Sequence, residues 1–154
     1  MGSEISGDIR NVTIRSCLMD NENWSPLRFK SQPSRGGTVE NITFEDITIK
    51  GARSIFDINM EWRMVPPLSP AHYPLTSLRN IHFKNINGEA QSAGTMYGFK
   101  EAPFGNDTFF FENCHIKAQK GLSISNVANV NFKGLELEIK EGEKIYERSA
   151  NKDK

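Results

Sequence analysis

The chain has 154 residues, with 19 lysines and arginines against 19 aspartates and glutamates. That length suits one domain with its own core. The charges balance and no basic cluster carries interleaved aromatic residues, so we expect no nucleic-acid partner. No apolar run approaches the roughly 20 residues that span a bilayer, so we expect no membrane partner either.

Taken in chain order, five segments align with one another without gaps. Their fourth, sixth and ninth places are always apolar, the third place is Asn in four of them, and the eighth is small or turn-forming. Apolar residues at places four and six predict a strand with its core face inward. The break in alternation before place nine predicts a bend, because Asn, Asp and Gly tolerate left-handed backbone. The segments are 9–19, 39–49, 78–88, 106–116 and 127–137.

A third short strand is predicted after each segment, at 27–30, 55–61, 95–100, 122–125 and 144–147. Three short strands per repeat predict an all-β fold, a parallel β-helix of about five coils that lie about 4.8 Å apart. The Asn column should then form a side-chain ladder between coils. The alternative is a β-sandwich or barrel built from strands spaced by about 8–12 residues.

We expect the coils to form a single domain at 1–149, followed by a disordered charged tail at 150–154. The first repeat begins without a capping segment, so we expect the β-helix to be truncated at its N-terminal end. An uncapped coil leaves backbone groups and apolar side chains open, which predicts self-association through this coil. Cys17 and Cys114 fall in the same column three coils apart, about 14 Å. That separation is too long for a disulfide and predicts two free buried thiols.

The strand at 27–30 carries the clearest binding signal. Leu27 and Phe29 point to one face, and Arg28 and Lys30 to the other, because side chains alternate across a strand. Two cations side by side on an exposed face can bind an anion, Arg in a bidentate manner and Lys as a point charge. The other possibility is an ordinary solvated strand face. Asp57, Asn59 and Glu61 lie on the equivalent face of the next coil and either pair with the cations or line a cleft.

Three motifs resemble the C-terminal half of the polygalacturonase family, glycoside hydrolase family 28. They are Gly2-Ser3-Glu4, Arg28-Phe29-Lys30 and Gly36-Gly37-Thr38-Val39-Glu40-Asn41. The resemblance implies a right-handed parallel β-helix that hydrolyses bonds next to galacturonic acid with inversion. It also implies that Arg28 and Lys30 bind a substrate carboxylate. The family's catalytic aspartates and its Gly-His-Gly motif lie before the Gly-Ser-Glu motif, so we assign no catalytic residue in this sequence.

The expected function is the C-terminal part of a polygalacturonase-like hydrolase acting on pectin, with an acidic oligosaccharide or polysaccharide as partner. Glu4 and Tyr97 are secondary binding candidates after Arg28 and Lys30. The alternative is a non-catalytic β-helix module that binds acidic glycans or assembles with itself. Whether the chain is an enzyme is left open, and the chain alone is expected to be inactive. Asp57 and Glu61, four residues apart on one strand, are about 13 Å apart, whereas inverting hydrolysis needs two carboxyl groups about 6.5–9.5 Å apart.

Metal and cofactor sites are not expected. The three histidines, His72, His82 and His115, do not cluster in the sequence, and no ligand spacing is present. We therefore predict no cofactor. The cellular compartment is left open, although relatives are commonly exported.

Overall fold

The computed structural model describes residues 1–20 and 24–148, so the tail predicted at 150–154 lies outside the described residues. Seven strands make up the regular structure of the described part, all in one sheet with parallel pairing. None of the described residues forms a helix long and apolar enough to cross a membrane. The strands are β1 (Ile9–Asp20), β2 (Leu27–Lys30), β3 (Thr38–Asn59), β4 (Ser77–Tyr97), β5 (Phe109–Glu112), β6 (Cys114–Ser125) and β7 (Leu135–Glu147).

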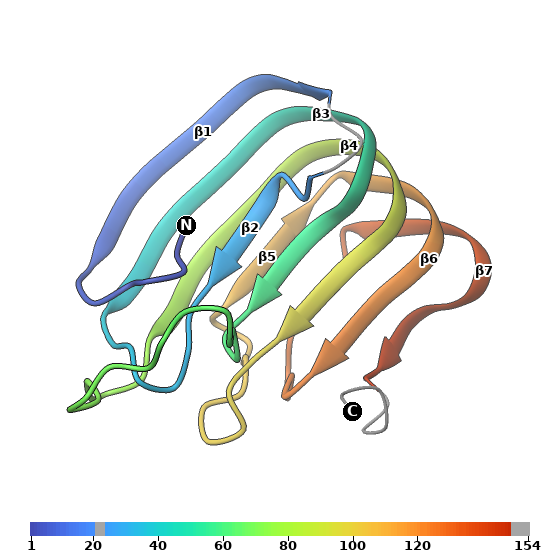
Figure 1. Cartoon of the computed structure of the whole chain (residues 1–154). Helices are drawn as coiled ribbons and strands as arrows, with labels where there is room; N and C mark the ends of the chain where they lie inside the picture. The colour runs from blue at the N-terminus through green and yellow to red at the C-terminus, as the bar shows by residue number, and fades with distance from the viewer. Residues whose placement is uncertain (21–23, 149–154) are drawn as a thin grey trace.

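The long strands lie on one another as stacked arches (Figure 1) in the order β1-β3-β4-β6-β7. The shorter β2 pairs with β3, and β5 pairs with β4. The register sets each repeat on the next, place for place: Ile14 lies opposite Phe44, and Phe44 opposite Phe83. This coil-on-coil arrangement is a parallel β-helix, so the predicted fold is confirmed.

The bends of the coils use left-handed backbone at the eighth place, as the repeat predicts, and also at the third place, where no bend was predicted. At the third place, Asn11, Asn41 and Asn80 have φ angles of 59°, 56° and 54°. At the eighth place, Asp46 and Asn85 have φ angles of 54° and 52°. Short polar side chains are among the few non-glycine residues that adopt this conformation at low cost. Bends at fixed places keep the apolar residues on both sides pointing inward.

The predicted Asn ladder is present and lies on the outside of the coils. The Asn41 amide nitrogen donates to the Asn11 side-chain oxygen at 2.9 Å, and Asn80 donates to Asn41 at 2.7 Å. A second ladder joins the eighth places, where Asn113 donates to Asn85 at 2.9 Å and Asn85 to Asp46 at 2.9 Å. Each ladder therefore holds the bends of successive coils in register.

The core runs along the axis of the coils and is dominated by phenylalanine. The Phe83 ring stacks between Phe44 at 5.5 Å and Phe111 at 5.4 Å, and Phe56 meets it edge-on at 5.1 Å. Such aromatic contacts add to the stabilisation from apolar burial. Places four, six and nine of the inner coils are buried, as the repeat predicts.

Two details differ from the expectations. The fifth segment forms no regular strand before β7, although Phe132 still stacks on Phe111 at 5.7 Å. This stretch lies at the end of the stack, where a short strand has a neighbouring coil on one side only and gains few ladder hydrogen bonds. The strands expected at 55–61 and 95–100 end earlier, at Asn59 and Tyr97, where the chain turns into loops.

Both cysteines are free thiols in one column, as expected. Cys17 lies opposite Ile47, and Ile47 lies opposite Ile86 on the next coil towards Cys114. Burial raises the pKa of the Cys114 thiol above its ordinary value. Cys17 is only partly buried, so the expectation of two buried thiols is wrong for this one. The reason is its place on β1, the outermost coil.

Candidate functional site

The site is built on β2, whose alternation follows the predicted pattern. Leu27 and Phe29 are completely buried in the core, which turns Arg28 and Lys30 outward. The parallel register places Arg28 opposite Asp57 and Lys30 opposite Asn59 on β3. The outward face of β2 and β3 therefore carries two cations and one carboxylate in adjacent columns.

The Nε atom of Arg28 is held by a neighbouring carboxylate, whereas part of the side chain is exposed to solvent. Its Nε atom lies 2.6 Å from Asp57 Oδ2, but the N–H does not point at the oxygen, so the contact is an ion pair and the buried Nε makes no hydrogen bond. The guanidinium carbon lies 5.7 Å from the Trp24 ring centroid. About a third of the side chain, 32 %, is exposed to solvent. The guanidinium can thus present its terminal nitrogens to a planar anion while Asp57 and Trp24 fix its orientation.

Lys30 is more enclosed than its neighbour. Its Nζ lies 3.3 Å from the Trp62 ring centroid, a cation–π contact, and 4.0 Å from Asp57 Oδ2. Only 11 % of the side chain is exposed. Burial and the adjacent Arg28 charge lower the pKa of Lys30 below its ordinary value of 10.5, and Asp57 partly offsets both effects. A second anion beside Lys30 would therefore stabilise the charged form of this side chain.

The secondary candidates lie in different surroundings. Glu4 is 63 % exposed and forms a 3.6 Å ion pair with Arg35. The Tyr97 hydroxyl donates to Ser123 Oγ at 3.0 Å, and the Arg148 guanidinium covers its ring at 4.6 Å. One ring face of Tyr97 is thus already occupied. A sugar-binding role for Glu4 or Tyr97 stays a prediction.

Both tryptophans of the chain, Trp24 and Trp62, belong to this site, and neither was predicted from the sequence. Neither belongs to a strand or to the repeat, so periodicity carries no information about them. The available signal was composition: two tryptophans, each a few residues from a predicted cationic strand or its neighbour. Only the folded coils show that each indole contacts a different cation.

A hollow of about 1000 Å³ lies among the loops that come after β2, β3 and β4 in the chain, next to the segment before β1. Three carboxylates line it: Asp8, Glu61 and Glu101. Asp8 accepts hydrogen bonds from Arg10 and from the backbone of Thr38, which lower the pKa of this carboxyl group. A carboxyl group held in its ionised form is a poor proton donor. Neither Arg28 nor Lys30 lines this hollow, which adjoins their site through Glu61, the neighbour of Trp62.

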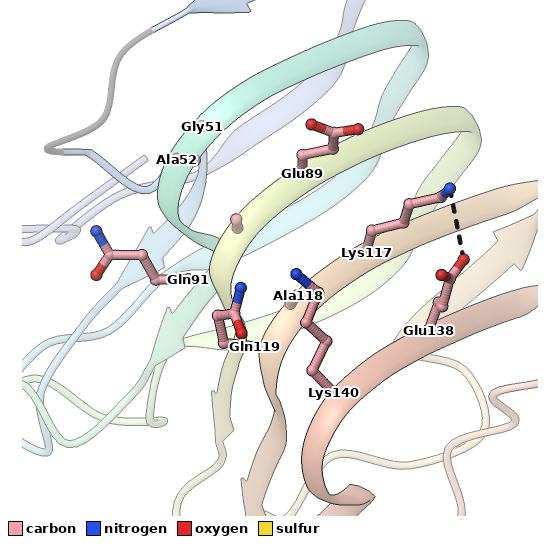
Figure 2. Close-up of a pocket in the computed structure, with 10 residues that line it drawn as sticks. Gly51, Ala52, Glu89, Gln91, Lys117, Ala118, Gln119, Glu138 and Lys140 are labelled. Carbon is pink, nitrogen blue, oxygen red and sulfur yellow. Dashed lines mark ion pairs between the residues drawn. The ribbon is translucent and has the colours of Figure 1, made fainter.

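A second hollow, of about 350 Å³, lies at the bend between the second and the third strand of each repeat (Figure 2). Small residues form its floor, among them Gly51, Ala52 and Ala118. On its rim Glu89 lies opposite Lys117, which reaches towards Glu138 in a 3.5 Å ion pair (Figure 2). These charges alternate in sign from coil to coil and compensate one another. Lys140 also lines the hollow, so its rim carries two carboxylates and two lysines, whereas the face of β2 has two cations beside one carboxylate.

Metal-ligating groups do not gather in the part of the chain that the structure describes: no three His, Cys, Asp or Glu side chains are placed to hold an ion. The His82 Nε2–H donates to Asn80 Oδ1 at 2.7 Å, and the His82 ring stacks on Phe110 at 4.9 Å. His115 contacts Glu136 and Asn113, each at 2.9 Å. Both histidines therefore make side-chain contacts on the outer surface of the coils.

Fold and site together define a parallel β-helix protein in which one strand, β2, carries two adjacent cations on its outer face. The family model described as Glycosyl hydrolases family 28 matches residues 1–135, most of the chain, and the chain belongs to this family. The polygalacturonase-like identity expected from the three motifs is thereby confirmed at the level of the family. Searches of curated proteins and of solved structures gave no match.

Proposed function

We propose that this chain provides the carboxylate-binding wall of a cleft for galacturonic-acid-containing polysaccharide, such as pectin. The supporting observation is the placement of Arg28 and Lys30 on one outward strand face with a single carboxylate, Asp57, between them. A galacturonate carboxylate would accept two hydrogen bonds from the Arg28 guanidinium and the charge of Lys30. Trp24 and Trp62 would border the sugar on either side, as aromatic rings do at many ligand sites.

We further propose that the chain by itself binds this polymer without cutting it. Inverting hydrolysis needs one carboxylic acid and one carboxylate about 6.5–9.5 Å apart. Near the cations, Asp57 forms an ion pair with Arg28, and Glu61 forms an ion pair with Arg148 at 3.9 Å. Neither carboxylate is free to act as a base towards water beside the bound sugar.

The two tryptophans allow a direct test. Because both indoles contact the cations of the site, tryptophan fluorescence, excited where the three tyrosines do not absorb, reports on this site alone. Oligogalacturonate should change the fluorescence with a saturable, salt-sensitive curve, whereas neutral galactose oligomers should not. A reducing-sugar assay with polygalacturonate should stay at the blank. Saturable binding of the neutral oligomer, or clear turnover that Arg28→Ala abolishes, would contradict the respective part of the proposal.

Binding should also fall as the pH rises through the lowered pKa of Lys30. Below that pKa Lys30 is charged and attracts the carboxylate; above it the ammonium is neutral and the attraction is lost. The fall should begin below the ordinary lysine value of 10.5, and Lys30→Arg should retain binding across the range because a guanidinium stays charged. The measurement is a fluorescence titration in steps of pH, with circular dichroism to confirm folding. An unchanged fall in Lys30→Arg would assign it to another group.

A second candidate function is a module whose role ends at glycan binding. The observation that favours it is that both carboxylates beside the two cations lie near arginines, Asp57 near Arg28 and Glu61 near Arg148. The genomic reading frame upstream separates the candidates. Asn-Thr-Asp, Asp-Asp and Gly-His-Gly motifs there would identify a hydrolase, whereas an independent start site would favour the binding module.

A further inference from the structure

The loop between β3 and β4, residues 61–75, forms one side of the cationic site. Its Trp62 ring lies over Lys30, with 3.3 Å between the Nζ atom and the ring centroid. Among the described residues, none between Met60 and Thr76 is buried, whereas these two flanking residues are. A loop without buried side chains gains little from apolar packing. Its position therefore depends on its hydrogen bonds.

The turn that follows β2, residues 31–36, supplies these hydrogen bonds. Ser31, Gln32 and Ser34 belong to this turn, and all three are buried although their side chains are polar. Buried polar groups are nearly always hydrogen-bonded, so the partners of such residues indicate what the residues hold in place. The partners of these three lie mainly in the loop at 61–75 and at its end.

Backbone and hydroxyl contacts fix the two ends of the loop. The Trp62 N–H donates to the Ser31 carbonyl at 2.9 Å, and the His72 N–H donates to the Ser34 carbonyl at 2.9 Å. The hydroxyl groups of Ser31 and Thr76 lie 2.7 Å apart, within hydrogen-bond distance. These contacts set where the loop begins and ends.

Two side chains fix the middle of the loop. Gln32 Nε2 donates to the carbonyl of Val65 at 3.1 Å and to that of Pro66 at 3.3 Å. Ser34 Oγ accepts the Leu68 N–H at 2.9 Å and donates to Gln32 Oε1 at 2.9 Å. The amide and the hydroxyl group thus form one connected network with the loop backbone, and such networks rigidify the segments that they join.

The middle of the loop is poorly equipped to hold itself. Pro66 and Pro67 lie at its centre. Proline has no backbone N–H, so these residues cannot donate a hydrogen bond that closes a turn. The side chains of Gln32 and Ser34 therefore carry the contacts on which this stretch depends.

We propose that Gln32 and Ser34 are positioning residues for the carboxylate site, an inference that rests on the function proposed above. Their side chains hold the loop so that Trp62 stays on Lys30. Lys30 directly precedes the turn, so one segment carries the cation and fixes the ring that encloses it. The site is thereby assembled before the glycan arrives, which reduces the cost of ordering side chains on binding.

A purely structural role is the alternative, in which the network only satisfies buried polar groups and adds to stability. The two roles differ in the folded state. Loss of a structural contact lowers the unfolding midpoint and leaves Trp62 where it is. Loss of a positioning contact exposes the Trp62 ring while the coils stay folded.

Acrylamide quenching without glycan measures this exposure. In a Trp24→Phe background Trp62 is the only tryptophan, so its fluorescence is seen alone. Gln32→Leu and Ser34→Ala should each shift the quenching constant towards that of the unfolded chain, with an unchanged circular dichroism spectrum. Unchanged quenching in the folded variants would overturn the proposal. Should Gln32→Leu not fold, Ser34→Ala decides the question.

Ser92→Ala is the matched control in the same background. Like Ser34, Ser92 accepts a backbone N–H, that of Gly94 at 3.0 Å, and donates to another group, the Gly121 carbonyl at 3.3 Å. It lies at the bend between the second and the third strand of its repeat, and none of these contacts involves the loop at 61–75. Its loss should leave the quenching of Trp62 unchanged. An increase equal to that of Ser34→Ala would overturn the proposal.

Glycan affinity tests the consequence for the site. In the chain with both tryptophans, Gln32→Leu should lower the affinity for oligogalacturonate by about three- to tenfold, because Trp62 and Lys30 must then be ordered on binding. Calorimetric titration gives the value. Wild-type affinity in a variant with an exposed Trp62 would overturn the role in binding. If the wild type itself binds no oligogalacturonate, the proposed glycan site is wrong, and the quenching data still decide whether the two residues position Trp62.

Discussion

Replacing Arg28 and Lys30 together with alanine is expected to lower the affinity for oligogalacturonate by about 100-fold or more. Each cation would make a charge-assisted contact with a sugar carboxylate, and such a contact contributes about 1.5–3 kcal/mol. The two contacts together therefore account for at least two decades of affinity. Tryptophan fluorescence or calorimetric titration measures the loss.

Arg79→Ala is the matched control for this double variant. Arg79 is also an exposed cation on a strand, 51 % exposed, and it pairs with Glu40 at 3.0 Å on a different face of the coils. Its loss should change the affinity less than about twofold, since exposed ion pairs contribute little. Equal affinities of the double variant and the wild type would remove the assignment of the site. Circular dichroism and the unfolding midpoint show that any loss of binding is not a loss of fold.

Phe83→Ala is expected to lower the free energy of unfolding by about 3–5 kcal/mol. The ring is completely buried and contacts the rings of Phe44 and Phe56 on the preceding coil and of Phe111 on the following coil. Removing it leaves a cavity at the centre of the stack, and the rigid coils around it can close it only in part. Equilibrium unfolding in urea, followed by circular dichroism, gives the difference.

Phe110→Ala provides the comparison on an adjacent strand. Phe110 points outward from β5, is 40 % exposed, and stacks on His82. Its removal should cost less than about 1 kcal/mol, as for most surface substitutions. Similar losses for Phe83→Ala and Phe110→Ala would show that the central stack does not hold the coils together as argued.

The sequence determined the parallel β-helix through its repeat. In such a fold each coil lies in register on the next, so the same place must be apolar, polar or bend-forming in every coil. The Asn ladder and the left-handed bends followed from that rule, as at Asn41 and Asp46. The outward direction of Arg28 and Lys30 followed from strand alternation alone. These features depend on local pattern, which a single sequence displays.

The surroundings of the two cations were decided by the tertiary structure. Trp62 reaches Lys30 from a loop after β3, and no periodicity relates the two residues. Asp57 was predicted to pair with the cations or to line a cleft, and only the register of β2 on β3 set its carboxylate 2.6 Å from Arg28. Lys30 is buried because the loop that carries Trp62 and the coil that carries Asp57 both lie against it. Contacts between loops and strands depend on distances across coils, which the order of residues along the chain does not contain.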